Sequence, residues 1–182
     1  PVLNKTYAVP LMTYAELKFI IGEYNGFSVE DYQEGVEASI DYWYDVMGET
    51  YDPEEVAAYV EAVCKNVNAE SFAIQKYIDL FTNGTEAWTE IRRTGYPEQI
   101  VRPGEICAVY NTDSGQTPYE FSPLSEVKGD IISRVKYPTD ESTLNSESWN
   151  AAVAKLQDGT NNYYSKMFWD VRTSSYDHPA NK

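Results

Sequence analysis

Three carboxylates spaced four residues apart are the first candidates for chemistry in this sequence. Glu37, Asp41 and Asp45 would share one face of a helix. Carboxyl groups crowded in this way raise one another's pKa, and a glycoside hydrolase needs two Asp or Glu side chains flanking a sugar bond. The sequence fixes no partner opposite them, and this spacing is more often that of a solvated helix face. A hydrolase therefore stays open as an alternative that one reducing-sugar assay would test.

Aromatic side chains are more numerous than a core of this size requires. The chain has 16 Tyr and 4 Trp, and the C–H faces of sugars stack on such rings while carboxylates and amides bond the hydroxyls. Trp43 and Trp149 fall on apolar helical stripes and are expected in the core. Off those stripes or in loops, where binding residues concentrate, lie the candidate ligand-binding residues Tyr44, Trp88, Tyr110 and Tyr119. Taken singly, each is more often part of an ordinary amphipathic surface.

Other catalytic and metal-binding arrangements lack their residues. His178 is the single His and lies in the tail, which argues against Ser-His-Asp or Cys-His catalysis. Neither phosphate-binding glycine motif occurs, and residues 111–115 lack the spacing of a calcium loop, so they predict a plain turn. Cys64 and Cys107 have no C-x-x-C spacing and are expected to be small buried hydrophobic residues. We therefore predict a protein that is not an enzyme and has no cofactor and no metal site.

The charge of the chain excludes two classes of partner. Its 182 residues contain 14 Lys and Arg against 29 Asp and Glu, a net charge of −15. Such a chain cannot neutralise a run of phosphates or hold anionic lipid through a polybasic patch, so no nucleic-acid partner is expected. The adjacent Arg92 and Arg93 would suit an anion clamp, but in so acidic a chain they predict structural ion pairs with nearby helices.

Residues 10–94 have the pattern of a helical array with short turns. Cap residues at Thr13, Ser28, Asp52 and Asn68 each precede an apolar stripe. Gly48 stops the second helix, Asn83-Gly84 is expected to close the fourth, and Thr85 to open the fifth. The stripes expected to face the core include Leu17, Ile20, Ile21 and Tyr24 in the first helix and Ile74, Tyr77, Ile78 and Phe81 in the fourth.

The rest of the chain divides into a loop-rich segment (95–144), a last helix with a closing segment (145–171) and a tail (172–182) expected to be mobile. The apolar runs 106–110 and 131–135 are expected to form a small hairpin or to stay extended. The last helix is expected after Asn145 and to end at Asp158-Gly159. The predicted fold is mainly α: helical hairpins with tetratricopeptide-like units, and at most a small β-hairpin.

Four stretches, read in order, resemble a known family. They are PLMTYAELKF (10–19), QKYIDLF (75–81), EAWTEIRRTGYP (86–97), and residues 137–145 closed by KMFWD (166–170). The set covers nearly all of residues 10–171 and resembles the C-terminal half of SusD/RagB-type outer-membrane nutrient-binding lipoproteins of the Bacteroidetes, specifically the SusD-like branch.

The resemblance implies non-catalytic binding of an oligosaccharide, or in some members a peptide, by a lipid-anchored protein on the outer leaflet. It implies delivery to a TonB-dependent, SusC-like transporter, and residues 1–182 as one piece that lacks the N-terminal half with its anchor. No binding residue is carried over, while Arg92, Arg93 and Tyr96 are implied to fix the turn after the fifth helix. We expect cell-surface glycan binding; the alternative is a helical-repeat module that binds peptide or protein partners.

Overall fold

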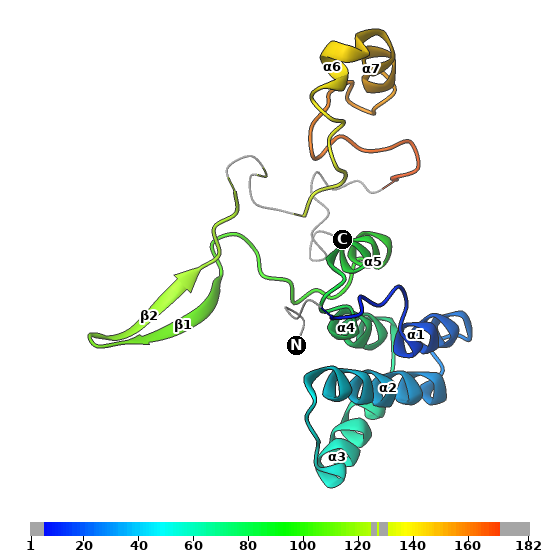
Figure 1. Ribbon diagram of the computed structural model, residues 1–182, viewed down its shortest axis with the longest axis vertical. Coiled ribbons are helices and arrows are strands. Elements are labelled where there is room, and N and C mark those ends of the chain that lie inside the picture. Colours follow the sequence, from blue (N-terminus) through cyan, green and yellow to red (C-terminus); the bar gives the residue numbers. More distant parts are fainter. Residues whose placement is uncertain (1–5, 125–126, 128–130, 172–182) are drawn as a thin grey trace. The chain divides into compact units, whose positions relative to one another are not determined.

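The computed structural model describes residues 6–124, 127 and 131–171, and the chain divides into two units, Pro1–Pro97 and Glu98–Lys182 (Figure 1). Helices dominate the first unit, and the described residues contain one two-stranded sheet. The prediction of a mainly α fold with a small hairpin is confirmed. No helix in the described part is long and apolar enough to cross a membrane.

The first unit is built from five α-helices and one 3₁₀ turn. They are α1 (Tyr14–Tyr24), α2 (Val29–Met47), α3 (Pro53–Val63), η1 (Cys64–Asn66), α4 (Ala69–Asp79) and α5 (Gly84–Thr94). The four predicted cap residues are confirmed, because the side chain of each accepts a hydrogen bond from a backbone N–H in the first turn. Gly48 ends α2 with φ 70°, a left-handed conformation that suits glycine.

The start of α5 differs from the prediction. The Asn83 side chain accepts from the Glu86 N–H, so Asn83 caps α5 and Gly84 is its first residue. The expected start at Thr85 and the expected role of Asn83-Gly84 in closing α4 are therefore wrong. Asn favours N-cap positions as strongly as turns, and here the cap forms.

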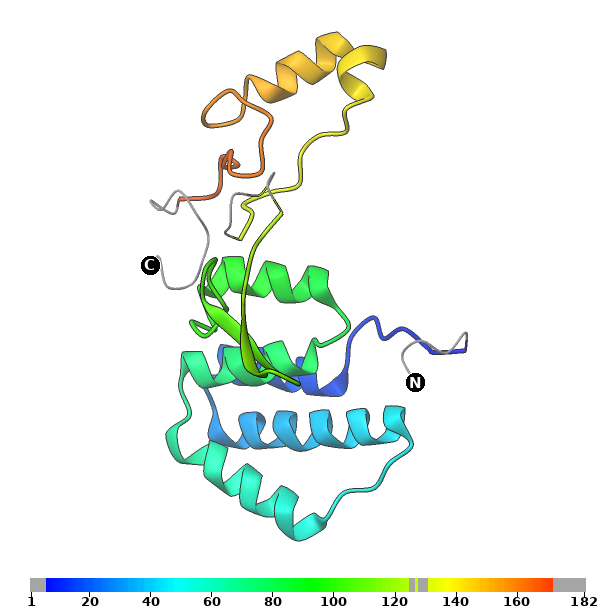
Figure 2. The same ribbon diagram turned by 90° about the vertical axis from the view of Figure 1, so that its left-hand side faces the viewer.

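Three aromatic rings form the centre of the first unit. Phe19 of α1, Tyr32 of α2 and Phe72 of α4 lie with centroid separations of 6.2 Å (19–32), 6.1 Å (19–72) and 5.0 Å (32–72). Glycines allow the helices to approach this closely: a Cβ on Gly22 would lie 2.6 Å from the Phe72 ring, and one on Gly35 would lie 2.7 Å from the Phe19 ring. Helices α1 and α2 thus pack as a hairpin with α4 against α1 (Figure 2).

The buried faces of α1 and α4 are not the predicted ones. Leu17, Ile20, Ile21 and Tyr24 are exposed, as are Tyr77, Ile78 and Phe81. The core-facing residues are instead Ala15, Glu16, Phe19 and Gly22 in α1 and Phe72, Gln75, Lys76 and Asp79 in α4. Each helix has apolar residues on two faces, and the buried face is the one that carries paired charges and small residues.

The second unit contains the hairpin and two short helices. Strand β1 (Ile106–Thr112) pairs antiparallel with β2 (Gly115–Glu120), and the turn predicted within residues 111–115 is formed by residues 113–114. Residues 131–135 are not a strand, so of the two alternatives for this run, a hairpin or an extended segment, the hairpin is wrong. Cys107 is exposed on β1 and Cys64 is half-buried, which corrects the expectation that both are buried.

The second unit continues with α6 (Glu141–Leu144), which the sequence did not predict, and α7 (Ser146–Val153). Helix α7 ends before the predicted stop: the N–H groups of Lys155 and Leu156 donate to carbonyls three residues back, and the Gln157 N–H donates to the Lys166 carbonyl. Burial opposes ionisation of Asp158, but hydrogen bonds from Thr160, Ser165 and Asn162 hold its pKa at about 2. Trp149 is only half-buried, so the prediction that it belongs to the core is not confirmed. The predicted tail, with His178, lies outside the described residues.

Candidate functional site

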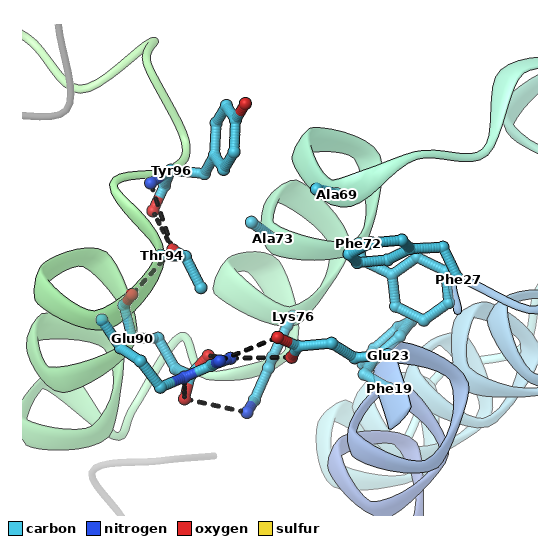
Figure 3. A pocket seen from close by; sticks show the side chains of 11 residues that line it. Phe19, Glu23, Phe27, Ala69, Phe72, Ala73, Lys76, Glu90, Thr94 and Tyr96 are labelled. Atoms are coloured by element: carbon cyan, nitrogen blue, oxygen red, sulfur yellow. Dashed lines mark hydrogen bonds and ion pairs between the residues drawn. The ribbon is translucent and has the colours of Figure 1, made fainter. Parts of the chain in front are cut away.

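A small pocket of 220 Å³ lies between α1, α4 and α5 (Figure 3). Ala69 and Ala73 of α4 line one side, where their small side chains leave space. Phe27 and Phe72, whose ring centroids are 5.5 Å apart, line a second side. Tyr96, just after α5, lines a third.

Ion pairs complete the wall of this pocket. Arg93 donates two hydrogen bonds of 2.7 Å to the two carboxylate oxygens of Glu23 and another of 2.7 Å to Glu90. Lys76 Nζ lies 3.2 Å from the other oxygen of Glu90. Burial opposes ionisation of Glu90, yet the hydrogen bond from Arg93 and the charge of Lys76 keep its pKa below the usual range.

These contacts give the pocket a structural role. Its two cations and two anions neutralise one another, and its volume is below the roughly 300–1,000 Å³ of typical ligand pockets. It is too small for an oligosaccharide. Arg93 joins α5 to α1, which confirms the predicted structural ion pair. The turn after α5 is held by Thr94, whose hydroxyl accepts from the Tyr96 N–H at 3.1 Å and donates to the Glu90 carbonyl.

Two more buried carboxylates lie within reach of the Lys76 charge. Asp79 is almost fully buried and accepts a 2.6 Å hydrogen bond from the Thr13 hydroxyl. Burial raises the pKa of Asp79 and of Glu16, and the nearby charge of Lys76 opposes both shifts. Lys76 therefore serves a whole set of buried acids rather than one partner.

A much larger apolar groove of 870 Å³ is formed by residues of α2, α3, α4 and α5. Its rings and aliphatic side chains include Trp43, Tyr44, Met47, Tyr77, Ile78 and Phe81. Tyr77, Ile78 and Phe81 belong to the stripe that the sequence assigned to the core. These residues do form one continuous apolar surface, but the structure places that surface along an open groove instead of in the core. The predicted core residue Trp43 also lines it, with its ring centroid 5.6 Å from that of Phe81.

The predicted ligand-binding residues lie in three settings. Tyr44 is half-buried in the apolar groove, with its ring 5.0 Å from that of Tyr51. Trp88 is half-buried on α5, where the Arg92 guanidinium carbon lies 5.2 Å from the ring centroid in a cation–π contact. The structure does not bring Tyr44 and Trp88 together.

Tyr110 and Tyr119, by contrast, are neighbours. Tyr110 lies opposite Thr117, and Tyr119 lies opposite Ala108, so the two tyrosines are diagonal partners on one face of the hairpin. Their ring centroids are 6.2 Å apart at 71°. Tyr110 is 57% exposed and Tyr119 is 49% exposed. The strand alternation places the hydroxyl-bearing Thr112 and Thr117 on the same face.

The three carboxylates on α2 are exposed, and two of them accept hydrogen bonds from separate partners. Asp41 accepts a 2.5 Å hydrogen bond from the Tyr51 hydroxyl, and Glu37 accepts one of 2.9 Å from Gln33. They form part of a solvated helix face, the simpler of the two interpretations of their spacing. Among the described residues, no group of three or more His, Cys, Asp or Glu side chains could hold a metal ion.

Residues 2–121 match the model of a SusD-like family, described as starch-binding and associating with the outer membrane. One similar solved structure is a chitin-binding protein, with a TM-score of 0.65 and 27% identity over 87% of this chain and 33% of that one. Another is a Bacteroidetes protein, AC2a SusD-like, with a TM-score of 0.63 and 25% identity over 89% of this chain and 30% of that one. The chain therefore spans about a third of each solved relative. None of the curated proteins matches it.

Proposed function

This chain belongs to the SusD-like family of starch-binding proteins that associate with the outer membrane, and we propose that it binds glycan there without acting on it as an enzyme. The family description and the chitin-binding relative support a glycan as the ligand. In this proposal the whole protein is lipid-anchored at the cell surface and passes its ligand to a TonB-dependent, SusC-like transporter. Residues 1–182 are proposed to be one part of a longer SusD-like domain.

The observation that carries the proposal is the exposed ring pair Tyr110–Tyr119. Two rings inclined at 71° present two differently oriented faces for the C–H surfaces of sugar units. The phenol groups and the hydroxyls of Thr112 and Thr117 provide donors and acceptors beside those faces. An exposed platform of this kind gives modest affinity, which suits a protein that must release its ligand. Tyr44 and Trp88 stay proposed as further ligand contacts.

Calorimetric titration with chitin and starch oligosaccharides tests this site. Replacing both rings in Tyr110→Ala/Tyr119→Ala removes about 1 kcal/mol of stacking per ring, so we expect binding to weaken by roughly 30-fold. Tyr110→Phe/Tyr119→Phe keeps the rings and should retain most of the affinity. Tyr24→Ala, on α1 and 90% exposed, is the control for loss of a surface tyrosine.

Two outcomes would contradict the proposal. Wild-type affinity in the double Ala variant would show that the hairpin does not contact the glycan. Release of reducing ends during incubation with the oligosaccharides would show a hydrolase instead of a binding protein.

A further inference from the structure

The charges that α2 and α3 bring to the apolar groove are all negative. Residues 29–63, which include α2 and α3, contain no Lys or Arg, while acidic residues recur throughout. Glu55 lines the groove. Glu37, Asp41 and Asp45 of α2 are exposed and each follows one residue after a side chain that lines it. We call these four carboxylates the acidic rim; no Lys or Arg is among the described residues that line the groove.

Apart from the proposed contact Tyr44, the lining of the groove is mostly apolar and offers a glycan few polar partners. Besides Glu55 and the hydroxyls of its tyrosines, the polar side chains of the lining are Ser39 and Gln75, both buried. Gln75 already donates a 2.8 Å hydrogen bond to the Tyr59 hydroxyl. An oligosaccharide here would lose hydration of its hydroxyls without finding enough partners. Apolar side chains of the groove are instead exposed to solvent, and Phe81 is 74% exposed. A row of apolar side chains from a partner would cover this surface.

A second copy of this chain is also a poor occupant. Each copy has a net charge of −15, and the groove itself is bordered by carboxylates. Two such faces brought together would place like charges side by side, which costs free energy. A segment that complements this surface has apolar side chains to fill the groove and flanking Lys and Arg side chains to pair with the acidic rim.

We propose that the apolar groove is the docking site of a cationic amphipathic segment of a protein partner. The apolar side chains of the segment insert between α2, α3 and α4, in the manner of a helix in a groove. Its Lys and Arg side chains face the acidic rim, which steers association and selects against acidic segments. This surface is separate from the Tyr110–Tyr119 pair, so either proposal can fail while the other holds.

The probe is a synthetic amphipathic helix of about 18 Leu and Lys residues, matched by a peptide in which every Lys is Glu. Fluorescence anisotropy with the complete 182-residue chain should show saturable binding of the Leu/Lys peptide and none of the Leu/Glu peptide. Between about 50 mM and about 500 mM NaCl, screening of the exposed rim should weaken binding by tenfold or more. Phe81→Ala should weaken it by about tenfold, and Tyr24→Ala, outside the groove, should not.

The rim is tested by Asp41→Asn/Asp45→Asn/Glu55→Gln. This variant should lose affinity and most of the salt dependence. The control removes three acidic charges in the second unit, Asp113→Asn/Glu120→Gln/Glu147→Gln, and should bind as the wild type does. Circular dichroism confirms that each variant is folded.

Several results would overturn the proposal. Equal binding of both peptides, or wild-type binding by the rim variant, would show that the groove does not select cations. Wild-type binding by Phe81→Ala would place the peptide elsewhere. Displacement of the peptide by a chitin oligosaccharide would assign the groove to glycan. If the chain self-associates as its concentration rises and loses peptide binding when it does, the groove would be assigned to a second copy.

Discussion

Replacing Gly35 with Ala tests the packing that holds the helices around the groove and the pocket. The new Cβ would lie 2.7 Å from Phe19 Cε1, 2.9 Å from Cδ1 and 3.0 Å from Cζ. Phe19 is 1% exposed and its ring is confined by Tyr32 and Phe72, so it cannot turn away. Overpacking of this kind costs about 1–3 kcal/mol, while Ala gains about 1 kcal/mol over Gly in helix propensity. We therefore expect a net loss of up to about 2 kcal/mol in the free energy of unfolding.

The assay is urea unfolding followed by far-UV circular dichroism, with Gly84→Ala as the control. Gly84 is the first residue of α5, and an added Cβ there meets nothing within 4 Å. That variant should be unchanged or more stable by up to about 1 kcal/mol. The two midpoints should then differ by roughly 1 M urea for a slope of about 2 kcal/mol/M. Equal stabilisation by both substitutions would refute close packing of Gly35 against Phe19.

The remaining predictions concern the buried charges. Lys76→Met leaves Glu90, 3.2 Å away, and the other buried acids without their cation. Urea unfolding should therefore show a loss of about 3–5 kcal/mol in the free energy of unfolding. The control Lys65→Met breaks only an exposed 3.6 Å pair with Glu61 and should lower that free energy by less than about 1 kcal/mol. Because burial raises the folded-state pKa of Glu16 above its usual 4.5, its contribution to stability is present below that pH and is lost as pH rises through the raised value. Glu16→Gln should therefore flatten the dependence of unfolding free energy on pH above about 4.5, and a curve parallel to that of the wild type would contradict this.

Helix starts were predictable because their cause is local. Thr13, Ser28, Asp52 and Asn68 each bond a backbone N–H within three residues, so the sequence contains both partners of every cap. The choice of buried face is not local. In α1 the helix could bury either the side of Leu17 or that of Phe19, and the decision depends on Phe72, more than fifty residues away in the sequence.

The candidate site was predictable residue by residue but not as an arrangement. Tyr110 and Tyr119 were each singled out as aromatic residues outside the helical stripes. Their pairing depends on the register of β1 with β2, and β2 contains Pro118, a residue that is uncommon inside strands. The apolar groove escaped prediction for the opposite reason, because its residues have the spacing of a core stripe, and only the tertiary arrangement leaves that stripe open.

The two proposed surfaces differ in the physics of recognition, and this makes them separable in one protein. Stacking of a neutral sugar on Tyr110 and Tyr119 involves no net charge on the ligand, so its affinity should change little with ionic strength. A cationic segment at the acidic rim is attracted over a distance that shrinks with the Debye length, about 10 Å at 0.1 M salt. The chain has many more acidic than basic residues and a net charge of −15, so it attracts a cationic segment at low salt. At high salt this attraction is screened. A salt titration carried out with each probe therefore distinguishes a sugar platform from a partner-docking groove without any substitution.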